Sequence, residues 1–210
     1  MRDHVEKIGD GDVISDKTPL AKLFPLLGNR PCYFVLVAGT ISGIVTRADL
    51  NKPPARVYLF GLISLLEMHL AFWIRRKFRD QWEQHVKPDR MADAVKLFEA
   101  RRKRGQELDL CECLQFCEKG ALIMANDALC RLFNIATRKS GERIFRRIQS
   151  LRDLLAHGQN NLAGDYPWEE LSDVVRWVEE ALEESDAAVE KAALEMGRNI
   201  LDTCWSPINE

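Results

Sequence analysis

The chain has few cysteines and no apolar segment at its N-terminus. Six cysteines in 210 residues are too few for the disulfide framework of a small secreted protein. A signal peptide would need an early run of apolar residues, and the opening MRDHVEKIGDGD contains none. We therefore expect a reducing, cytoplasmic location. The sequence also has no repeat of the solenoid kind.

Three cysteines lie close together, yet their spacing does not predict a metal site. Cys111, Cys113 and Cys117 form the pattern C-x-C-x3-C, with Cys130 further along. Zinc knuckles normally pair their cysteines differently, and this segment has the apolar stripe of a helix. We interpret these residues as buried structural thiols and predict no metal.

The net charge is close to zero, at −2, but the charged residues are unevenly distributed along the chain. Residues 71–104 contain 11 Lys or Arg and 5 acidic residues, whereas residues 165–210 contain 13 acidic residues and 3 basic ones. Such asymmetry indicates one surface that attracts an anionic partner and another that repels it.

One segment, residues 57–74, is nearly long and apolar enough to span a membrane. Glu67 and His69 lie near its middle, where each would be costly in hydrocarbon. We expect instead a helix that is buried inside the protein or in a dimer, and no membrane partner.

Residues 1–54 and 55–210 differ in pattern, and we predict a domain boundary between them. The first part contains a short strand at DVIS, a helix at PLAKLFPLL that Pro25 ends or kinks, and a hairpin of CYFVLVA and ISGIVT. The second part is helical throughout, with helices over residues 55–79, 90–104, 109–133, 140–157 and 168–202. The predicted fold is mainly α, a small α/β unit followed by an all-α helical bundle.

The residues GIVTRADL, Gly43 to Leu50, resemble the end of a CBS (cystathionine-β-synthase-like) motif, over roughly residues 8–60. Such motifs normally occur in pairs and hold an adenosine-bearing ligand between them. The resemblance implies that Thr46 and Asp49 contact the ribose of an adenine nucleotide, AMP or ATP. Only one motif is visible, so a second chain would have to supply the other. The alternative from the residues alone is that Thr46 and Asp49 cap a helix.

The stretch SLRDLLAHGQ presents Arg152, Asp153 and His157 at the end of a helix that Gly158 is expected to stop. Asp153 and His157 are four residues apart, so the carboxylate can orient the imidazole. Arg152 lies about 140° around the helix from His157. An imidazole that exchanges protons near neutrality, beside a permanent cation, suits attack by an RNA 2′-hydroxyl on a phosphate and requires no metal. The alternative is a surface salt bridge and a capped last turn.

Arg-polar-x3-His near the end of a late helix resembles the HEPN (higher eukaryotes and prokaryotes nucleotide-binding) superfamily, over about residues 55–200. Its ribonuclease members carry Arg-x4-6-His, and two subunits usually combine their motifs in one cleft. The resemblance implies a homodimer in which Arg152, Asp153 and His157 are catalytic. It also implies that Glu67 orients Arg152, although a structural ion pair explains Glu67 equally well.

We therefore predict a metal-independent endoribonuclease that an adenine nucleotide regulates, with RNA and an antitoxin-like protein as further partners. The alternative is a non-catalytic regulator that binds a nucleotide or a partner protein. Basic side chains that could contact RNA phosphates follow the long apolar segment and close the next helix; they are Arg75, Arg76, Arg79, Arg101, Arg102, Lys103 and Arg104.

Overall fold

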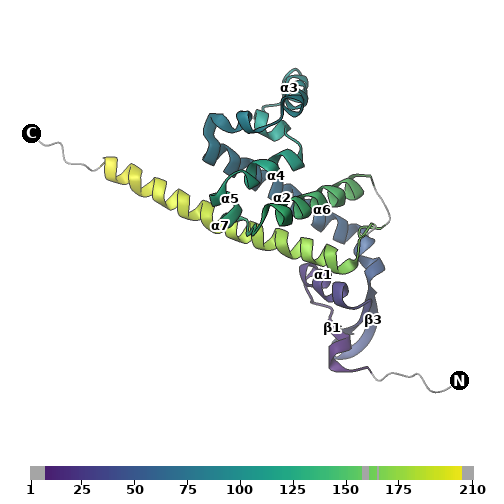
Figure 1. Cartoon of the computed structure of the whole chain (residues 1–210). Coiled ribbons are helices and arrows are strands. Elements are labelled where there is room, and N and C mark those ends of the chain that lie inside the picture. The colour runs from purple at the N-terminus through teal and green to yellow at the C-terminus, as the bar shows by residue number, and fades with distance from the viewer. Residues whose placement is uncertain (1–7, 158–160, 165, 205–210) are drawn as a thin grey trace, which may run out of the picture. The chain divides into compact units, whose positions relative to one another are not determined.

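The computed structural model describes residues 8–157, 161–164 and 166–204, without the side chains of residues 80 and 195–204. Within these residues the chain is mainly helical and has one small sheet, so the predicted fold class is confirmed at that level (Figure 1). The strands are β1 (Val13–Ser15), β2 (Cys32–Val37) and β3 (Thr40–Thr46). The α-helices are α1 (Leu20–Asn29), α2 (Pro53–Phe78), α3 (Pro88–Arg102), α4 (Phe116–Met124), α5 (Asp127–Leu132), α6 (Arg138–Ala156) and α7 (Trp168–Cys204).

The described residues form two compact units, each made of two separate segments of the chain. Unit 1 consists of residues 1–64 and 146–178, and unit 2 of residues 65–145 and 179–210. The helices α2, α6 and α7 each contribute to both units. The units therefore do not follow the order of the sequence.

Unit 1 contains the sheet. β1 and β2 are parallel, connected through α1, and β2 pairs with β3 in an antiparallel hairpin. The hairpin turns at Ala38 and Gly39, which have φ values of +50° and +81°, as a two-residue turn of the type favoured by right-handed strand twist requires. Pro25 lies inside α1 without ending it, so of the two predicted effects, an end or a kink, the first is wrong. Phe24 and Leu27, close to it in the helix, are buried in the core.

Contacts between distant segments explain why residues 146–178 belong with the N-terminus. A Cβ on Gly28 would lie 2.8 Å from the Cβ of Ser172, so glycine permits close approach of α1 and α7. Arg47 donates to the carbonyls of Leu27 and Gly28, and it forms an ion pair with Glu169 at 3.3 Å. These contacts fix the end of α1 against the start of α7.

Unit 2 is built around the second half of α2. Its buried side chains include Leu66, Leu70 and Ile74 of α2. Two glycines allow helices to approach closely: a Cβ on Gly120 would meet the ring of Phe145 at 2.6 Å, and one on Gly141 would meet the sulfur of Met124 at 2.5 Å. Residues 109–133 divide within the stretch Ala125-Asn126-Asp127, one of the two divisions that the sequence allows (the other is Gly120), and Asn126 caps α5.

Two further expectations can be compared with the fold. The helix predicted over residues 168–202 is present as the continuous helix α7. Cys111 and Cys113 are buried as predicted, whereas Cys117 is exposed, because it lies on the outer side of α4. The interpretation of all these thiols as buried is therefore wrong for Cys117.

The long apolar helix α2 is the one described helix whose length and composition would allow it to cross a membrane. One side of it packs in the cores of the two units, while Val57, Phe60, Leu65 and Met68 are exposed, at 72%, 56%, 48% and 66%. At 100° per residue these four lie within one arc of about 140°. α2 therefore has an apolar face that no described segment covers.

Candidate functional site

The predicted catalytic residues lie at the C-terminal end of α6, in unit 1. The helix is regular up to Ala156, and the N–H of His157 still donates to the carbonyl of Asp153 at 3.0 Å. His157 and Asp153 are exposed and Arg152 is half-buried. Since the helix is regular, the Arg152 and His157 side chains leave it about 140° apart, as expected from the ideal period. Gly158, the expected stop, lies outside the described residues.

Asp153 contacts a different residue from the one predicted. Its Oδ1 accepts a hydrogen bond from Nε2 of Gln149, one turn earlier, at 2.8 Å. No described bond links the Asp153 carboxylate to His157. The orienting role of Asp153 thus stays a prediction, in which the imidazole would donate to Oδ2, the oxygen that Gln149 does not contact.

Arg56 holds this end of α6 in place. It comes from the first turns of α2, and its Nη2 donates to the carbonyls of Leu154 and Leu155, both at 3.1 Å. These carbonyls are among the four that have no partner within a helix, and an arginine can satisfy them while balancing the negative end of the helix dipole. Arg56 thereby adds a second guanidinium close to the last turn of α6.

The segment after His157 is attached by two further side chains. The Leu162 N–H donates to Oδ1 of Asn51 at 2.8 Å. Arg147, only 2% exposed, donates to the Ala163 carbonyl at 2.7 Å, and its guanidinium carbon lies 3.9 Å from the centre of the Tyr166 ring. Burial lowers the pKa of Arg147, yet at such a high starting value the group keeps its charge. The α6 end is thus fixed on both sides.

Glu67 belongs to unit 2 and forms a structural ion pair there. Its Oε1 accepts a hydrogen bond from Nζ of Lys119 at 2.7 Å. Lys119 is almost fully buried, with 2% of its side chain exposed against 22% for Glu67. The structural alternative for Glu67 thus has a defined partner, while its action on Arg152 stays a prediction.

Thr46 and Asp49 are joined to each other in a capping box. Oδ2 of Asp49 accepts from the Thr46 N–H at 2.7 Å and from the Thr46 hydroxyl at 2.8 Å, while Lys52 contacts Oδ1 at 2.6 Å. The hydrogen bond from Lys52, followed by those from Thr46, lowers the pKa of Asp49. The capping alternative is therefore present, and a ribose would have to compete with these bonds.

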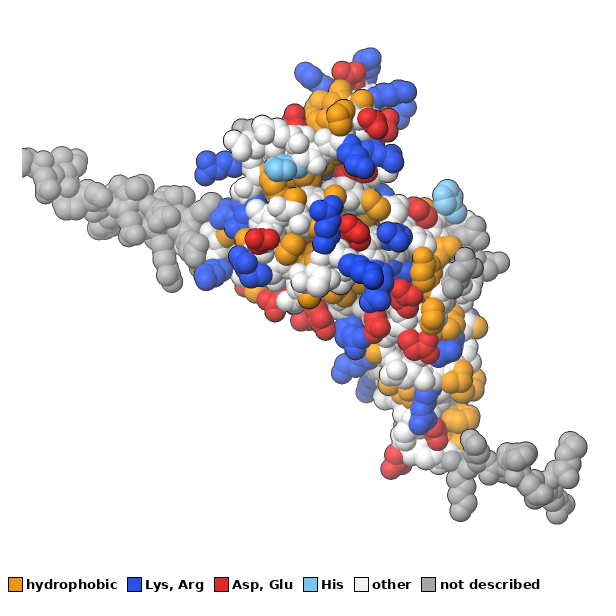
Figure 2. Space-filling model, in the orientation of Figure 1, with side chains coloured by type: hydrophobic (Ala, Val, Ile, Leu, Met, Phe, Trp, Pro, Cys, Tyr) orange, Lys and Arg blue, Asp and Glu red, His pale blue; other side chains and the backbone are white. Residues whose placement is uncertain are grey.

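The basic side chains predicted to contact RNA lie in unit 2, and Figure 2 shows Lys and Arg side chains gathered around α3. Arg75 is engaged in ion pairs with Glu112 at 3.2 Å and Asp109 at 3.8 Å. Arg76 and Arg79 are exposed, as are the residues that follow Arg101, namely Arg102, Lys103 and Arg104. These exposed residues are accessible to a polyanion, whereas Arg75 would have to leave its acidic partners.

Sequence reasoning missed Arg56, Arg147 and Lys119. Arg147 and Lys119 each fall inside the apolar arc of their own helix, next to Ile148 and Gly120 respectively. A single cation within an apolar stripe is a readable signal of a buried, paired charge. Arg56 had no such signal, because its acceptors lie 98 and 99 residues away in the sequence.

The described residues contain no group of three or more His, Cys, Asp or Glu side chains placed to hold a metal ion. Comparison with known protein families, with curated proteins and with solved structures gives no significant match to this chain.

Proposed function

We propose that the chain is a metal-independent endoribonuclease of HEPN type that acts as a homodimer in the cytoplasm. The observation that supports this most directly is the exposed last turn of α6, which carries His157 and Arg152 and is fixed by Arg56. A proton-transfer group and guanidinium groups at one braced helix end suit phosphodiester chemistry.

In the proposed reaction, an imidazole of His157 removes the proton from a ribose 2′-hydroxyl. The resulting oxygen attacks the neighbouring phosphorus, and the bond from phosphorus to the 5′-oxygen breaks. The products are a 2′,3′-cyclic phosphate and a 5′-hydroxyl, whose proton comes from a protonated imidazole. Arg152 stabilises the charge that develops on the non-bridging oxygens.

A second copy of the chain completes this proposal. Arg152 and His157 diverge on their own helix, so one chain does not direct both side chains at a single phosphate. The exposed apolar face of α2 offers a surface for self-association: it carries no charge at Val57, Phe60, Leu65 or Met68. A surface that is apolar along its length is complementary to itself and suits a twofold pair.

Gly61 supports the same pairing. It lies within this face, and a Cβ placed on it would meet nothing within 4 Å. Glycine within a helix costs about 1 kcal/mol relative to alanine, and internal packing does not require it here. By contrast, Gly28, Gly120 and Gly141 all face atoms closer than 3.0 Å. Close approach of a second α2 would explain why this position is a glycine.

The remaining parts of the proposal concern regulation. An adenine nucleotide would bind the CBS-like unit through Thr46 and Asp49 and bias the dimer, and an antitoxin-like protein would restrain the activity. Nucleotide binding would have to displace the Thr46–Asp49 hydrogen bonds, which predicts weak affinity in the monomer.

The test is cleavage of end-labelled RNA in the presence of EDTA. Wild type should cleave and leave 2′,3′-cyclic phosphate ends, while His157→Ala and Arg152→Ala should each lose at least about 100-fold in rate. Arg131→Ala, which removes an exposed arginine on α5, is the control for Arg152→Ala. Neither wild type nor any variant should cleave a substrate that has 2′-deoxyribose at the scissile position, because it lacks the attacking hydroxyl.

Two results would overturn the proposal. Cleavage that survives in His157→Ala would show a contaminating nuclease or a different site. RNA left intact by pure, dimeric wild type would favour the non-catalytic regulator, which predicts a thermal shift with AMP or ATP instead.

A further inference from the structure

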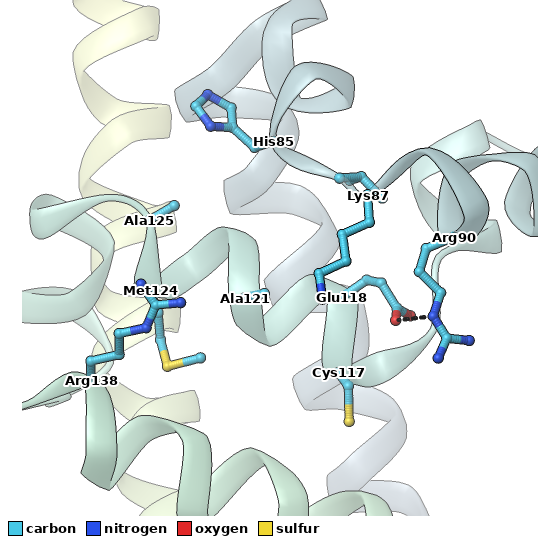
Figure 3. A pocket seen from close by; sticks show the side chains of 10 residues that line it. His85, Lys87, Arg90, Cys117, Glu118, Ala121, Met124, Ala125 and Arg138 are labelled. Atoms are coloured by element: carbon cyan, nitrogen blue, oxygen red, sulfur yellow. Dashed lines mark ion pairs between the residues drawn. The ribbon is translucent and has the colours of Figure 1, made fainter.

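The described part of unit 2 contains a cavity of about 420 Å³ that the proposed nuclease site does not use. This volume lies within the roughly 300–1,000 Å³ of small-molecule sites. Figure 3 shows the cavity between the start of α3, the helix α4 and the first residue of α6. Its lining comprises His85, Val86, Lys87, Arg90, Cys117, Glu118, Ala121, Met124, Ala125 and Arg138.

The charges around the cavity are mostly positive. Lys87, Arg90 and Arg138 bring three permanent cations, whereas Glu118 is the one acidic side chain of the lining. Arg90 lies 3.7 Å from a Glu118 oxygen, and Arg138 contacts Glu142 at 3.0 Å on the exterior. The cation excess favours an anionic occupant, since charges on a concave surface reinforce one another.

The backbone at the start of α3 adds to this preference. Lys87 is the N-cap residue and Pro88 follows it, and the Lys87 side chain makes no capping hydrogen bond. The N-terminus of a helix of this length carries a partial positive charge and free donors. Asp89 lies in the first turn but is not part of the cavity wall.

Glu118 supplies the observation that points to a specific kind of ligand. Its side chain is 16% exposed, and its Oε2 is buried without a hydrogen-bond partner among the described residues. A buried carboxylate oxygen needs a donor, and the ion pair with Arg90 is made through the other oxygen, Oε1. A ligand hydroxyl or amino group inside the cavity would provide that donor.

We propose that this cavity binds a small phosphate monoester that also carries a hydroxyl or amino donor. The phosphate would lie beside Lys87, Arg90 and the start of α3, which Figure 3 shows on one side of the cavity. The donor would bond to Oε2 of Glu118, and the organic part would pack on Ala121, Met124 and Ala125. This inference is independent of the proposed nuclease, because it uses none of its residues.

The first experiment measures binding by calorimetry on the full chain, with AMP, ribose 5-phosphate, adenosine and inorganic phosphate as separate probes. We expect AMP or ribose 5-phosphate to bind with one site per chain, and adenosine and inorganic phosphate to bind at least tenfold more weakly. Arg90→Ala and Lys87→Ala should each weaken binding of the better monoester by tenfold or more. Glu118→Gln should weaken it by a smaller factor, since an amide oxygen can still accept.

Two matched controls come from the same unit. Lys96→Ala removes an exposed lysine of α3, and Arg131→Ala removes an exposed arginine of α5; neither residue lines the cavity. Both should bind like wild type. Thermal melts of each variant separate lost binding from lost folding.

Hydrogen exchange with the better monoester locates the site. Protection over residues 86–91 and 117–125 supports the proposal, whereas protection over residues 40–50 would place the ligand in unit 1 and overturn it. Failure of both monoesters to bind at about 5 mM, roughly 5,000 times the Kd of a micromolar site, would also overturn it. If inorganic phosphate bound as tightly as the better monoester, the proposed hydrogen bond between the ligand and Glu118 would be wrong.

Discussion

The buried pair of Lys119 and Glu67 allows a stability prediction of defined size. The Lys119 side chain is 2% exposed, so replacing Glu67 by leucine leaves a buried ammonium whose other hydrogen bond among the described residues is to the Glu112 carbonyl at 3.4 Å. Removal of one partner of a buried ion pair costs about 3–5 kcal/mol. Replacing Lys119 by methionine leaves a carboxylate that is 22% exposed and can rehydrate, so we expect a smaller loss of about 1–3 kcal/mol.

The double variant distinguishes the pair from the separate residues. Leucine at position 67 and methionine at position 119 together fill a similar volume without charge. Such replacements of a buried ion pair often leave the free energy of unfolding unchanged. We expect the double variant to unfold within about 1–2 kcal/mol of wild type, which gives a coupling energy of at least about 2 kcal/mol. Urea unfolding followed by circular dichroism measures all four proteins. The exposed pair of Asp173 and Arg176, replaced by alanines in a parallel cycle, should couple by less than about 1 kcal/mol.

Two results would refute this reasoning. A loss below about 1 kcal/mol for Glu67→Leu would mean that Lys119 finds another partner or sheds its proton. A variant that keeps full stability but loses RNA cleavage would assign Glu67 to the positioning of Arg152.

Three further predictions concern the cap, the apolar face and the thiols. Asp49→Ala should destabilise the protein by about 1 kcal/mol near neutral pH through loss of the capping box. Because the folded pKa of Asp49 is lowered, this contribution is present above the unfolded pKa and is lost as pH falls through the folded pKa; an Asp49→Ala effect that persists at pH 2 would contradict it. Phe60→Asp should convert the dimer to a monomer in light scattering, whereas Leu97→Asp, at an exposed site on α3, should not; a dimer that survives Phe60→Asp would exclude the α2 face. Iodoacetamide at pH 8 should label the exposed Cys117 and spare Cys111, because burial raises the pKa of Cys111 to about 11; rapid labelling of Cys111 in the native protein, read by mass spectrometry, would show that this segment opens.

Much of the secondary structure was predictable, because it depends on local periodicity and turn chemistry. The β-branched and aromatic residues of the hairpin, with a glycine between them, predict β2 and β3. The apolar stripe of residues 140–157 predicts α6, and Ile148 and Leu151 of that stripe are buried. Because α6 is regular, Arg152 and His157 are separated by about 140° around it, and this angle can be calculated from the sequence alone.

The prediction failed where a local rule competed with packing. Pro25 was predicted to end or kink its helix, but α1 continues through it, and Phe24 and Leu27 near it are buried. Cys117 was assigned to the apolar stripe of one helix, yet the segment divides into a 3-10 helix at Leu110–Cys113 and α4, and Cys117 is exposed. The periodicity of a single helix does not predict where one helical segment ends and the next begins.

The sequence by itself determined which segments are helical, the mainly α class, and the positions of Arg152 and His157 on one helix, since each of these depends on neighbours within a few residues. The tertiary structure alone decided which segments join the N-terminal sheet, which cation caps α6, and how Lys119 and Glu118 are surrounded. These contacts join residues separated by tens of positions, and each depends on the packing of several helices at once. Local periodicity carries no information about such pairings, so only the folded chain reveals them.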